Sequence, residues 1–382
     1  MVHYLNICHP FPITHTNGHK YLLEGENTIG PLTGYKIIEF SPYPVGSILG
    51  MLLSDQGAEV TRINSTSDCE PRMENSANSV WNRGKKFLNV DTKAKAGIDH
   101  LLQLIGISDV VIYDRHSDYY DGFDLSYQSF SKRNPGLVCV SLPGFPKGHM
   151  HEDLPPDEGI IAAASGVYSL NPSGEIPIPG EGPSFHGLPY AGTFAAITAS
   201  AAVVAALYQR EKHGEGQQII IPVHDAMYQG MGTALVRHSK RTHGNQERHP
   251  VIKRFYQCKD GRWININISL PRFLKPFLET IDHIEWLEPL TDTKNLLSNQ
   301  ASLRNWIRRF SEVWLSKTAL EWEDTMAKLG IPGTLCRTID EWLESKHSVI
   351  SGATIIVDDP VFGRMKQPGK IIRFNNHNNE TR

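Results

Sequence analysis

Strand-like and helix-like segments alternate between residues 34 and 142, and this alternation constrains the fold more than any other feature of the chain. The runs GYKIIEF (34–40), DVVIYD (109–114) and GLVCVSL (136–142) are short, apolar and rich in β-branched residues, as is typical of buried strands. Between the first two, PVGSILGMLLSDQGAEVTRI (44–63) indicates a helix, a turn at Gly57 and a second strand. The pattern predicts a mostly parallel sheet with helices on its faces and right-handed crossovers.

The longest apolar run is AAITASAAVVAALY (195–208), and Thr198 and Ser200 interrupt it. It is shorter than the roughly 20 residues that a membrane-spanning helix needs, so it predicts a buried helix and no membrane segment. Gly214 and Gly216 follow it and are typical helix stop signals. The segments QQIIIPV (217–223) and HDAMYQGMGTALVRH (224–238) then predict another strand and another helix.

The chain divides by composition into four parts. Residues 1–28 show no clear period and are interpreted as an extension, and residues 29–237 form a large α/β domain. Residues 238–345 begin with a basic, His-rich loop and continue with the hairpin YQCKDGRWININI (256–268), whose Asp-Gly turn joins two β-rich runs. Amphipathic helices follow the hairpin, so this part is predicted to be a smaller α+β domain. Residues 346–382 are expected to return to the large domain.

Charge and cysteine usage exclude several classes of protein. The chain has 382 residues with 38 Lys and Arg against 41 Asp and Glu, and this near-neutral balance argues against a dedicated nucleic-acid binder. The five cysteines are scattered, with no CxxC pair, which is typical of reduced thiols in a cytoplasmic protein. The first residues lack a basic start followed by an apolar run, so we expect no signal peptide.

The loop before the apolar helix, GLPYAGTF (187–194), lies where a reactive group or anion is often found, yet it holds no Asp, Glu, His, Cys or Lys. Glu181 and His186 flank it and are candidate acids or bases. Asp157 and Glu158 precede another apolar run and are either further candidates or helix caps. The HxH pair in HMHED (149–153) lacks further ligands at zinc spacing, so we predict no metal.

Several ordered segments resemble the family III CoA-transferases (the CaiB/BaiF family), which include formyl-CoA transferases, carnitine CoA-transferases and α-methylacyl-CoA racemases. They lie between residues 31 and 374 and are PLTGYKIIEFSPYPVGSILGMLLSDQGAEVTRI, NRGKKFLNVD, DVVIYDR, NPGLVCVSLPGF, AALYQREKHGEGQQIIIPVHDAM, KLGIPGTLCRTIDEWL and DDPVFGRMKQPGKIIRF. The resemblance implies an open, Rossmann-like large domain built from both chain ends, a smaller domain, and two chains interlocked as a dimer.

The same resemblance implies a catalytic aspartate just before the long apolar helix. In the family this carboxylate attacks a thioester carbonyl, becomes a mixed anhydride and then receives the CoA thiolate. Counting back from the glycine-rich end of the helix places the position at Gly192, or at Ala191 if the spacing differs by one. Neither residue can form an acyl intermediate. The racemase branch uses its equivalent aspartate as one of two bases, and the other is a His that is expected, as part of a His-Asp pair, where this chain has Asp157 and Glu158.

The resemblance also implies that coenzyme A or an acyl-CoA is the cofactor and that cations bind its phosphates. The cations that remain are Arg83, Lys85 and Lys86 of the NRGKK segment, together with Arg72 and Arg115. Others are replaced, for example at Pro143, and each lost charge-assisted bond is worth about 1.5–3 kcal/mol. We therefore expect weakened CoA binding.

Two functions remain open from the sequence. The first is a non-catalytic subunit that pairs with an intact family III paralogue. The second is a divergent enzyme, as a homodimer or heterodimer, that uses Asp157, Glu158, Glu181 or His186 on an acyl-CoA or another carboxylic substrate.

Overall fold

A computed structural model describes residues 30–65, 76–114, 126–169, 187–232, 249–359 and 362–374. The chain forms two compact units, one made of residues 1–235 and 352–382 and the other of residues 236–351. The candidate residues Arg72, Arg115, Glu181 and His186 and the predicted extension at residues 1–28 lie outside the described ranges.

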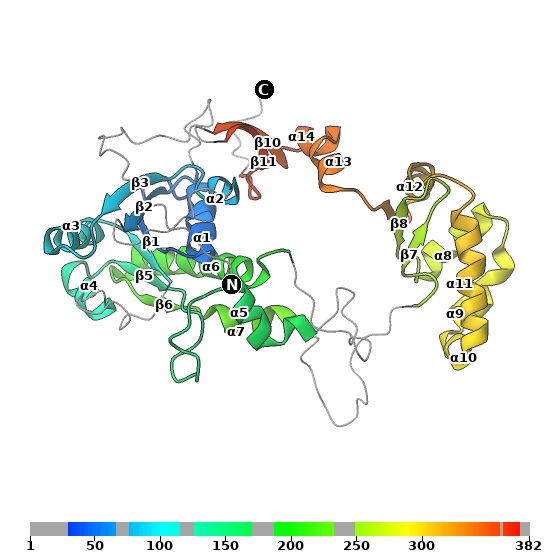
Figure 1. Cartoon of the computed structure of the whole chain (residues 1–382), viewed down its shortest axis with the longest axis horizontal. Helices are drawn as coiled ribbons and strands as arrows, with labels where there is room; N and C mark the ends of the chain where they lie inside the picture. Colours follow the sequence, from blue (N-terminus) through cyan, green and yellow to red (C-terminus); the bar gives the residue numbers. More distant parts are fainter. Residues whose placement is uncertain are drawn as a thin grey trace, which may run out of the picture. The chain divides into compact units, whose positions relative to one another are not determined.

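The first unit is built around a parallel sheet of six strands, as the sequence alternation predicts, and the strand order is β3-β2-β1-β4-β5-β6 (Figure 1). The strands are β1 (Lys36–Phe40), β2 (Glu59–Ser65), β3 (Lys86–Val90), β4 (Val110–Tyr113), β5 (Val138–Ser141) and β6 (Gln218–Ile220). Strands β1 and β4 are neighbours although two strands lie between them in the sequence. This order creates a topological switch point, where open α/β sheets usually bind ligands at the carboxyl ends of the strands.

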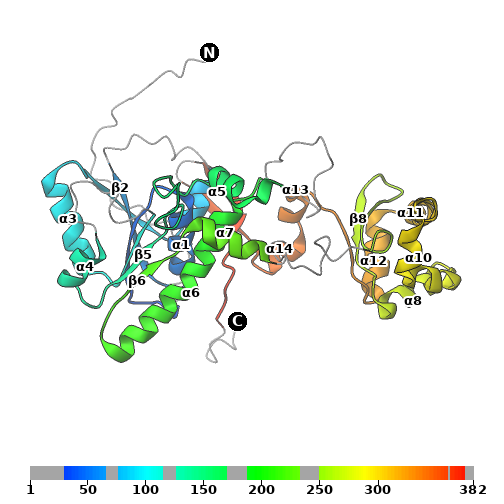
Figure 2. The same ribbon diagram turned by 90° about the horizontal axis from the view of Figure 1, so that it is seen from below.

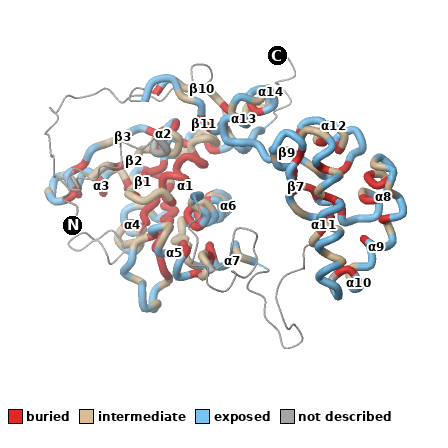
Figure 3. Tube along the Cα trace, turned by 45° about the vertical axis from the view of Figure 1, so that its right-hand side comes forward, coloured by how far each residue is buried: buried red, intermediate tan, exposed pale blue. Residues whose placement is uncertain are grey.

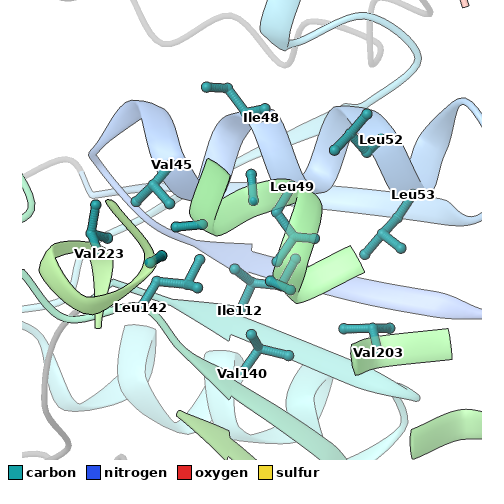
Figure 4. Close-up of a cluster of buried hydrophobic side chains, with 14 of the residues drawn as sticks. Val45, Ile48, Leu49, Leu52, Leu53, Ile112, Val140, Leu142, Val203 and Val223 are labelled. Carbon is teal, nitrogen blue, oxygen red and sulfur yellow. The ribbon is translucent and has the colours of Figure 1, made fainter. Parts of the chain in front are cut away.

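Helices cover both faces of this sheet (Figure 2). One face packs against α1 (Pro44–Ser54), α5 (Glu158–Ser165), α6 (Tyr190–His213) and α7 (Val223–Met231), while α3 (Lys95–Gly106) and α4 (Tyr127–Arg133) pack on the other. Side chains alternate between the two cores along each strand: Ile37 faces the first and Ile38 the second. Figure 4 shows Leu49 of α1, Val203 of α6 and Ile112 of β4 in the first core.

Turn and cap residues explain where several elements end. Gly57 has a φ of +96° in the turn before β2, and Gly214 ends α6 in the left-handed conformation with a φ of +77°, as the sequence predicts. Strand β6 is shorter than the predicted run 217–223, because Pro222 already serves as the N-cap of α7. Helix α7 ends at Met231, before the end of the predicted segment 224–238.

The second unit contains an antiparallel sheet of β7 (Phe255–Gln257), β8 (Trp263–Ile266) and β9 (Gly333–Leu335). The predicted hairpin at the Asp-Gly turn is confirmed, since β7 pairs antiparallel with β8. The helices are α8 (Pro271–Thr280), α9 (Leu287–Thr291), α10 (Thr293–Ser298), α11 (Gln300–Trp314), α12 (Ala319–Lys328), α13 (Ile339–Leu343) and α14 (Lys346–Ile350). Aromatic side chains such as Trp314 and Trp322 fill the core between this sheet and helices α8 to α12.

The C-terminal segment returns to the first unit. Strands β10 (Thr354–Asp359) and β11 (Gly363–Pro368) form an antiparallel hairpin. The guanidinium of Arg83, at the turn before β3, donates to the carbonyl of Pro368 at 2.9 Å. Ser79 of α2 (Ser76–Trp81) also donates to Asp359 of the hairpin. Both chain ends therefore contribute to the large unit.

Candidate functional site

A carboxylate from α5 is bound at the N-terminus of α6, next to the position where the family resemblance implies an aspartate. Oε1 of Glu158 accepts the backbone N–H of Ala191 at 2.9 Å, and Oε2 accepts that of Gly192 at 3.0 Å. Glu158 is the first residue of α5 and is half-buried, while Ala191 and Gly192 lie buried in the first turn of α6. The segment 187–194, which the sequence predicted as a loop, is helical from Tyr190 on, and a neighbouring helix supplies it with an acidic group.

The chemistry of helix ends explains this contact. The first N–H groups of a helix have no partner within the helix, and the helix dipole favours negative charge there. Pro189 is the N-cap of α6 and gives no side-chain hydrogen bond. Glu158 takes over this role from a distance of 33 residues in sequence.

A side chain at position 192 would begin in van der Waals contact with the carboxylate of Glu158. A Cβ added at Gly192 would lie 3.6 Å from Oε2 of Glu158 and 3.8 Å from Val45. An aspartate at this position would hold its carboxylate against that of Glu158. The glycine at 192 and the glutamate at 158 are therefore compatible with each other in a way that two acidic residues would not be.

Asp157 has the structural role that the sequence offered as an alternative. It is the N-cap of α5, and its Oδ1 accepts the N–H of Ile160 at 3.1 Å.

Burial, together with the charges of Glu158 and Asp157, raises the pKa of Tyr168 above its usual value. This phenol therefore stays protonated at neutral pH beside the two carboxylates.

Arg83 is bound inside the first unit. Its Nε donates to Oδ1 of Asp55 at 3.0 Å, its NH2 group to Oδ2 at 2.5 Å, and its NH1 group to the carbonyl of Pro368. This bidentate pair joins the end of α1 to the turn before β3, and the third bond reaches the C-terminal hairpin.

Lys85 is fully buried beneath α1. Its Nζ lies 2.6 Å from Oε2 of Glu39 and donates to the carbonyl of Ser47 at 2.8 Å. The guanidinium of Arg62 lies 3.4 Å from the other oxygen of Glu39. A Cβ at Gly50 of α1 would lie 2.0 Å from Oε2 of Glu39, so glycine makes room for this pair. Burial lowers the pKa of Lys85 to about 8.

The third cation of the NRGKK segment lies at the surface. Nζ of Lys86 is 2.6 Å from Oε1 of Glu59 on the neighbouring strand, and both side chains are about half exposed. The segment thus holds three cations in three different environments, each with a partner in the protein. Sequence reasoning missed the partner of Lys85, although an acidic residue, Glu39, within the apolar strand run was a signal for a buried cation.

The two histidines of the HMHED segment pack around an aromatic side chain. The ring of Phe145 stacks on that of His149 at 4.8 Å between centroids and on His224 at 5.2 Å, and His151 approaches its edge at 5.6 Å. Across the described ranges, no group of three or more His, Cys, Asp or Glu side chains converges to hold a metal ion.

The chain is similar to known proteins over most of its length. The model of CoA-transferase family III matches residues 32–382. The chain belongs to this family.

Individual relatives are distant. The CoA-transferase/lyase DddD of Marinomonas sp. is 28% identical over 91% of this chain and 46% of its own length, so the chain spans about half of that relative. The succinyl-CoA–L-malate CoA-transferase alpha subunit of Chloroflexus aurantiacus is 21% identical, over 90% of the chain and 83% of its own length. A crystal structure of a CAIB/BAIF family protein from Brucella suis has a TM-score of 0.75 at 21% identity, covering 91% and 93% of the two chains, and so shares the fold.

Proposed function

We propose that this chain is a non-catalytic family III subunit that pairs with an intact CoA-transferase paralogue. The supporting observation is the contact at the start of α6. Position 192 is glycine, and both oxygens of Glu158 accept backbone N–H groups. The paralogue would supply the aspartate that forms the acyl intermediates, while this chain would supply half of the dimer. The Chloroflexus relative is named as an alpha subunit, which is in keeping with a multi-subunit assembly.

The hydrogen bonds of Glu158 oppose its use as a nucleophile. Each oxygen of the carboxylate accepts one N–H bond and would lose electron density on attacking a thioester carbonyl, so the bonds from Ala191 and Gly192 stabilise the resting anion and weaken it as a nucleophile. Hydrogen bonds to a charged group contribute about 1.5–3 kcal/mol each, and their weakening would add to the barrier of the first chemical step. Glu158 is better suited to stabilising the helix than to carrying an acyl group.

Weak binding of coenzyme A is part of the proposal. Arg83 and Lys85 are already paired with Asp55 and Glu39, so neither is available to a phosphate without breaking an internal ion pair. Of the described cations in the NRGKK segment, Lys86 is the one most exposed to solvent.

A cytoplasmic location is also part of the proposal and is supported by the free thiols of Cys139, Cys258 and Cys336.

Thermal unfolding of the purified chain with and without coenzyme A tests the proposal. We expect no increase in the melting temperature at millimolar coenzyme A, and we expect stable expression to require a co-expressed paralogue. A homodimer whose melting temperature rises clearly with coenzyme A would overturn the proposal, because ligand binding to the folded state must stabilise it.

One observation favours a second function, a divergent enzyme with Glu158 as its reactive carboxylate. This carboxylate lies 3.6 Å from where a side chain at position 192 would begin. In that case the purified chain would transfer CoA from succinyl-CoA to an acceptor acid, and Glu158→Gln would abolish the transfer. Activity that persists in Glu158→Gln, or no activity at all, would exclude this role.

A further inference from the structure

Three histidine rings gather around the buried ring of Phe145, and the proposed function uses none of them. Phe145 lies shortly after β5 and is fully buried. The rings of His149 and His224 lie 4.8 and 5.2 Å from it between centroids, at interplanar angles of 16° and 28°. His151 approaches the edge of the same ring at 5.6 Å. We call these four residues the histidine stack.

The histidine stack joins a loop to a helix. His224 lies in the first turn of α7, which carries buried and exposed residues (Figure 3), and the other three members lie in the loop between β5 and α5. The start of this loop is bound to α7 by backbone hydrogen bonds, from Val223 to the carbonyl of Pro143 at 2.8 Å and from His224 to that of Gly144 at 2.9 Å. Farther along the loop, the rings of His149 and His224 continue the contact, with centroids 5.6 Å apart.

One hydrogen bond within the loop requires that His149 be uncharged. Its Nδ1 accepts the backbone N–H of His151 at 3.1 Å. A ring nitrogen that accepts a hydrogen bond carries no proton, so the proton of the neutral ring is assigned to Nε2. Protonation of the ring places a second proton on Nδ1 and turns the acceptor into a donor that faces another donor. The charged form of His149 therefore cannot keep this bond.

The histidine stack can accommodate a first positive charge, on His224. Oδ1 of Asp225 lies 3.1 Å from Nδ1 of His224, so a protonated His224 has an acidic partner. One imidazolium near the face of Phe145 also gains a cation–π attraction. The ring of Tyr228, which is uncharged near neutral pH, stacks on His224 at 6.3 Å. We therefore expect His224 to become charged first.

A second charge, on His149, meets repulsion. The ring of His149 lies 5.6 Å from that of His224 and 5.4 Å from that of His151, so an imidazolium there faces charges of its own sign. It also loses the bond from His151. Protonation of His149 therefore opposes the closed loop by two independent effects.

The charged side chains of the loop and of α5 do not give His149 the kind of partner that His224 has in Asp225. Three acidic residues of this region already accept backbone N–H groups: Glu152, Asp157 and Glu158. Two further charged residues are exposed and opposite in sign: Lys147 and Asp153. The charge on His149 would thus be poorly balanced.

We propose that the histidine stack is an acid-sensitive latch, which holds the loop between β5 and α5 on α7 and releases it when His149 becomes charged beside His224. Imidazole side chains ordinarily change charge between about pH 5 and 8, so the closed loop is favoured at neutral pH and is lost as the pH falls. The loop leads into Asp157 and Glu158, so its release reaches the candidate site. The latch does not depend on the proposed function, since it would act alike in a non-catalytic subunit and in an enzyme.

Hydrogen exchange of the full chain between pH 7.5 and pH 5 tests the latch, with the paralogue co-expressed where expression requires it. The rates are corrected for the pH dependence of exchange in an unfolded chain. We expect the protection of the loop amides, including that of His151, to fall at least about tenfold as the pH is lowered. The fall should depend on about two protons, because opening requires charges on both His149 and His224.

His224→Phe keeps an aromatic ring in the histidine stack and removes one of the two charges. We expect its loop to lose less than about threefold in protection, with a dependence on about one proton or fewer. The same substitution at an exposed histidine of α3, His100→Phe, should leave the wild-type behaviour unchanged.

His149→Phe gives a second reading should His224→Phe fail to fold. It lacks the acceptor for the N–H of His151, so its protection should be lower at every pH but should no longer depend on pH. Protection in the wild-type loop that stays constant with pH, or an equal fall in the wild-type chain and in a folded variant of His149 or His224, would overturn the proposal.

Discussion

The start of α6 and the turn before β3 differ in how they relate to the family's chemistry. At the start of α6, the position where the family resemblance implies an aspartate holds Gly192, yet a carboxylate from α5 is bound there by two backbone N–H groups. In the turn before β3 the cations are present, yet Arg83 and Lys85 are bound to acidic residues inside the unit.

The comparison teaches that a cation in a matching segment can be held by the fold, and that a position without a carboxylate can receive one from a neighbouring helix. In both regions the side chains stabilise the fold, through a helix terminus in one case and buried ion pairs in the other. Mutations can test whether these side chains stabilise the folded protein as much as the two sets of contacts predict.

The largest effect is expected where the ion pair is fully buried. Lys85→Ala leaves Glu39 buried with only Arg62 nearby, and removal of one partner from such a pair costs about 3–5 kcal/mol. Lys86→Ala, in the half-exposed pair with Glu59, should cost less than about 1 kcal/mol. Urea unfolding of both variants measures this difference, and equal losses would show that Lys85 is not held as described.

The stability contributed by Lys85 should also depend on pH. Burial lowers its pKa in the folded protein, so between about pH 8 and the ordinary value of 10.5 the unfolded chain binds more protons than the folded one. Stability therefore rises with pH in this window, by about 2 kcal/mol, relative to a Lys85→Met variant that lacks the titrating group. The difference in unfolding free energy between the two proteins, measured at pH 7.5 and pH 10, checks the sign. A difference that is constant or falls would refute the assignment.

Removal of the carboxylate at the start of α6 should have a moderate effect. Glu158→Ala leaves the N–H groups of Ala191 and Gly192 to solvent and should destabilise the first unit by about 2 kcal/mol. Asp157→Ala serves as a control, because it removes the cap of α5 at a cost of about 1 kcal/mol. Hydrogen exchange of the first turn of α6 should increase in Glu158→Ala alone. Unchanged exchange there would contradict the contact.

A smaller effect is expected when the aspartate that the resemblance implies is introduced at position 192. Gly192→Asp places a second carboxylate beside Glu158, and repulsion between them should lower stability at pH 7 by about 1 kcal/mol. The double variant Gly192→Asp/Glu158→Gln should recover this loss. Thermal unfolding distinguishes the outcomes, and a single variant as stable as the double variant would show that the two positions do not interact.

The sequence predicted the parts of the fold that depend on residues close together in the chain. The alternation of strands and helices predicted the parallel sheet, the Asp-Gly turn predicted the pairing of β7 with β8, and Gly214 marked the end of α6. It was less informative about contacts that depend on strand order. Glu39 and Lys85 are 46 residues apart and meet only because β1 and the turn before β3 lie under the same helix.

In the candidate site, too, the sequence indicated a local contact and missed a contact between distant residues. The cap at Asp157 follows from its place before an apolar run, so the sequence offered it as an alternative. The bond from Glu158 to Gly192 joins two helices that are 34 residues apart, and no local pattern encodes it. It depends on the packing of α5 beside α6, which the structure supplies.

Mass spectrometry of the protein after incubation with succinyl-CoA tests the central claim most directly. A carboxylate that acts as the family's nucleophile would retain CoA as a thioester on its own side chain. We expect no CoA adduct on Glu158 in the wild-type chain, because its two oxygens are held by the backbone of α6, and we expect an adduct on a co-purified paralogue. A CoA thioester on Glu158, absent from Glu158→Gln, would contradict the account.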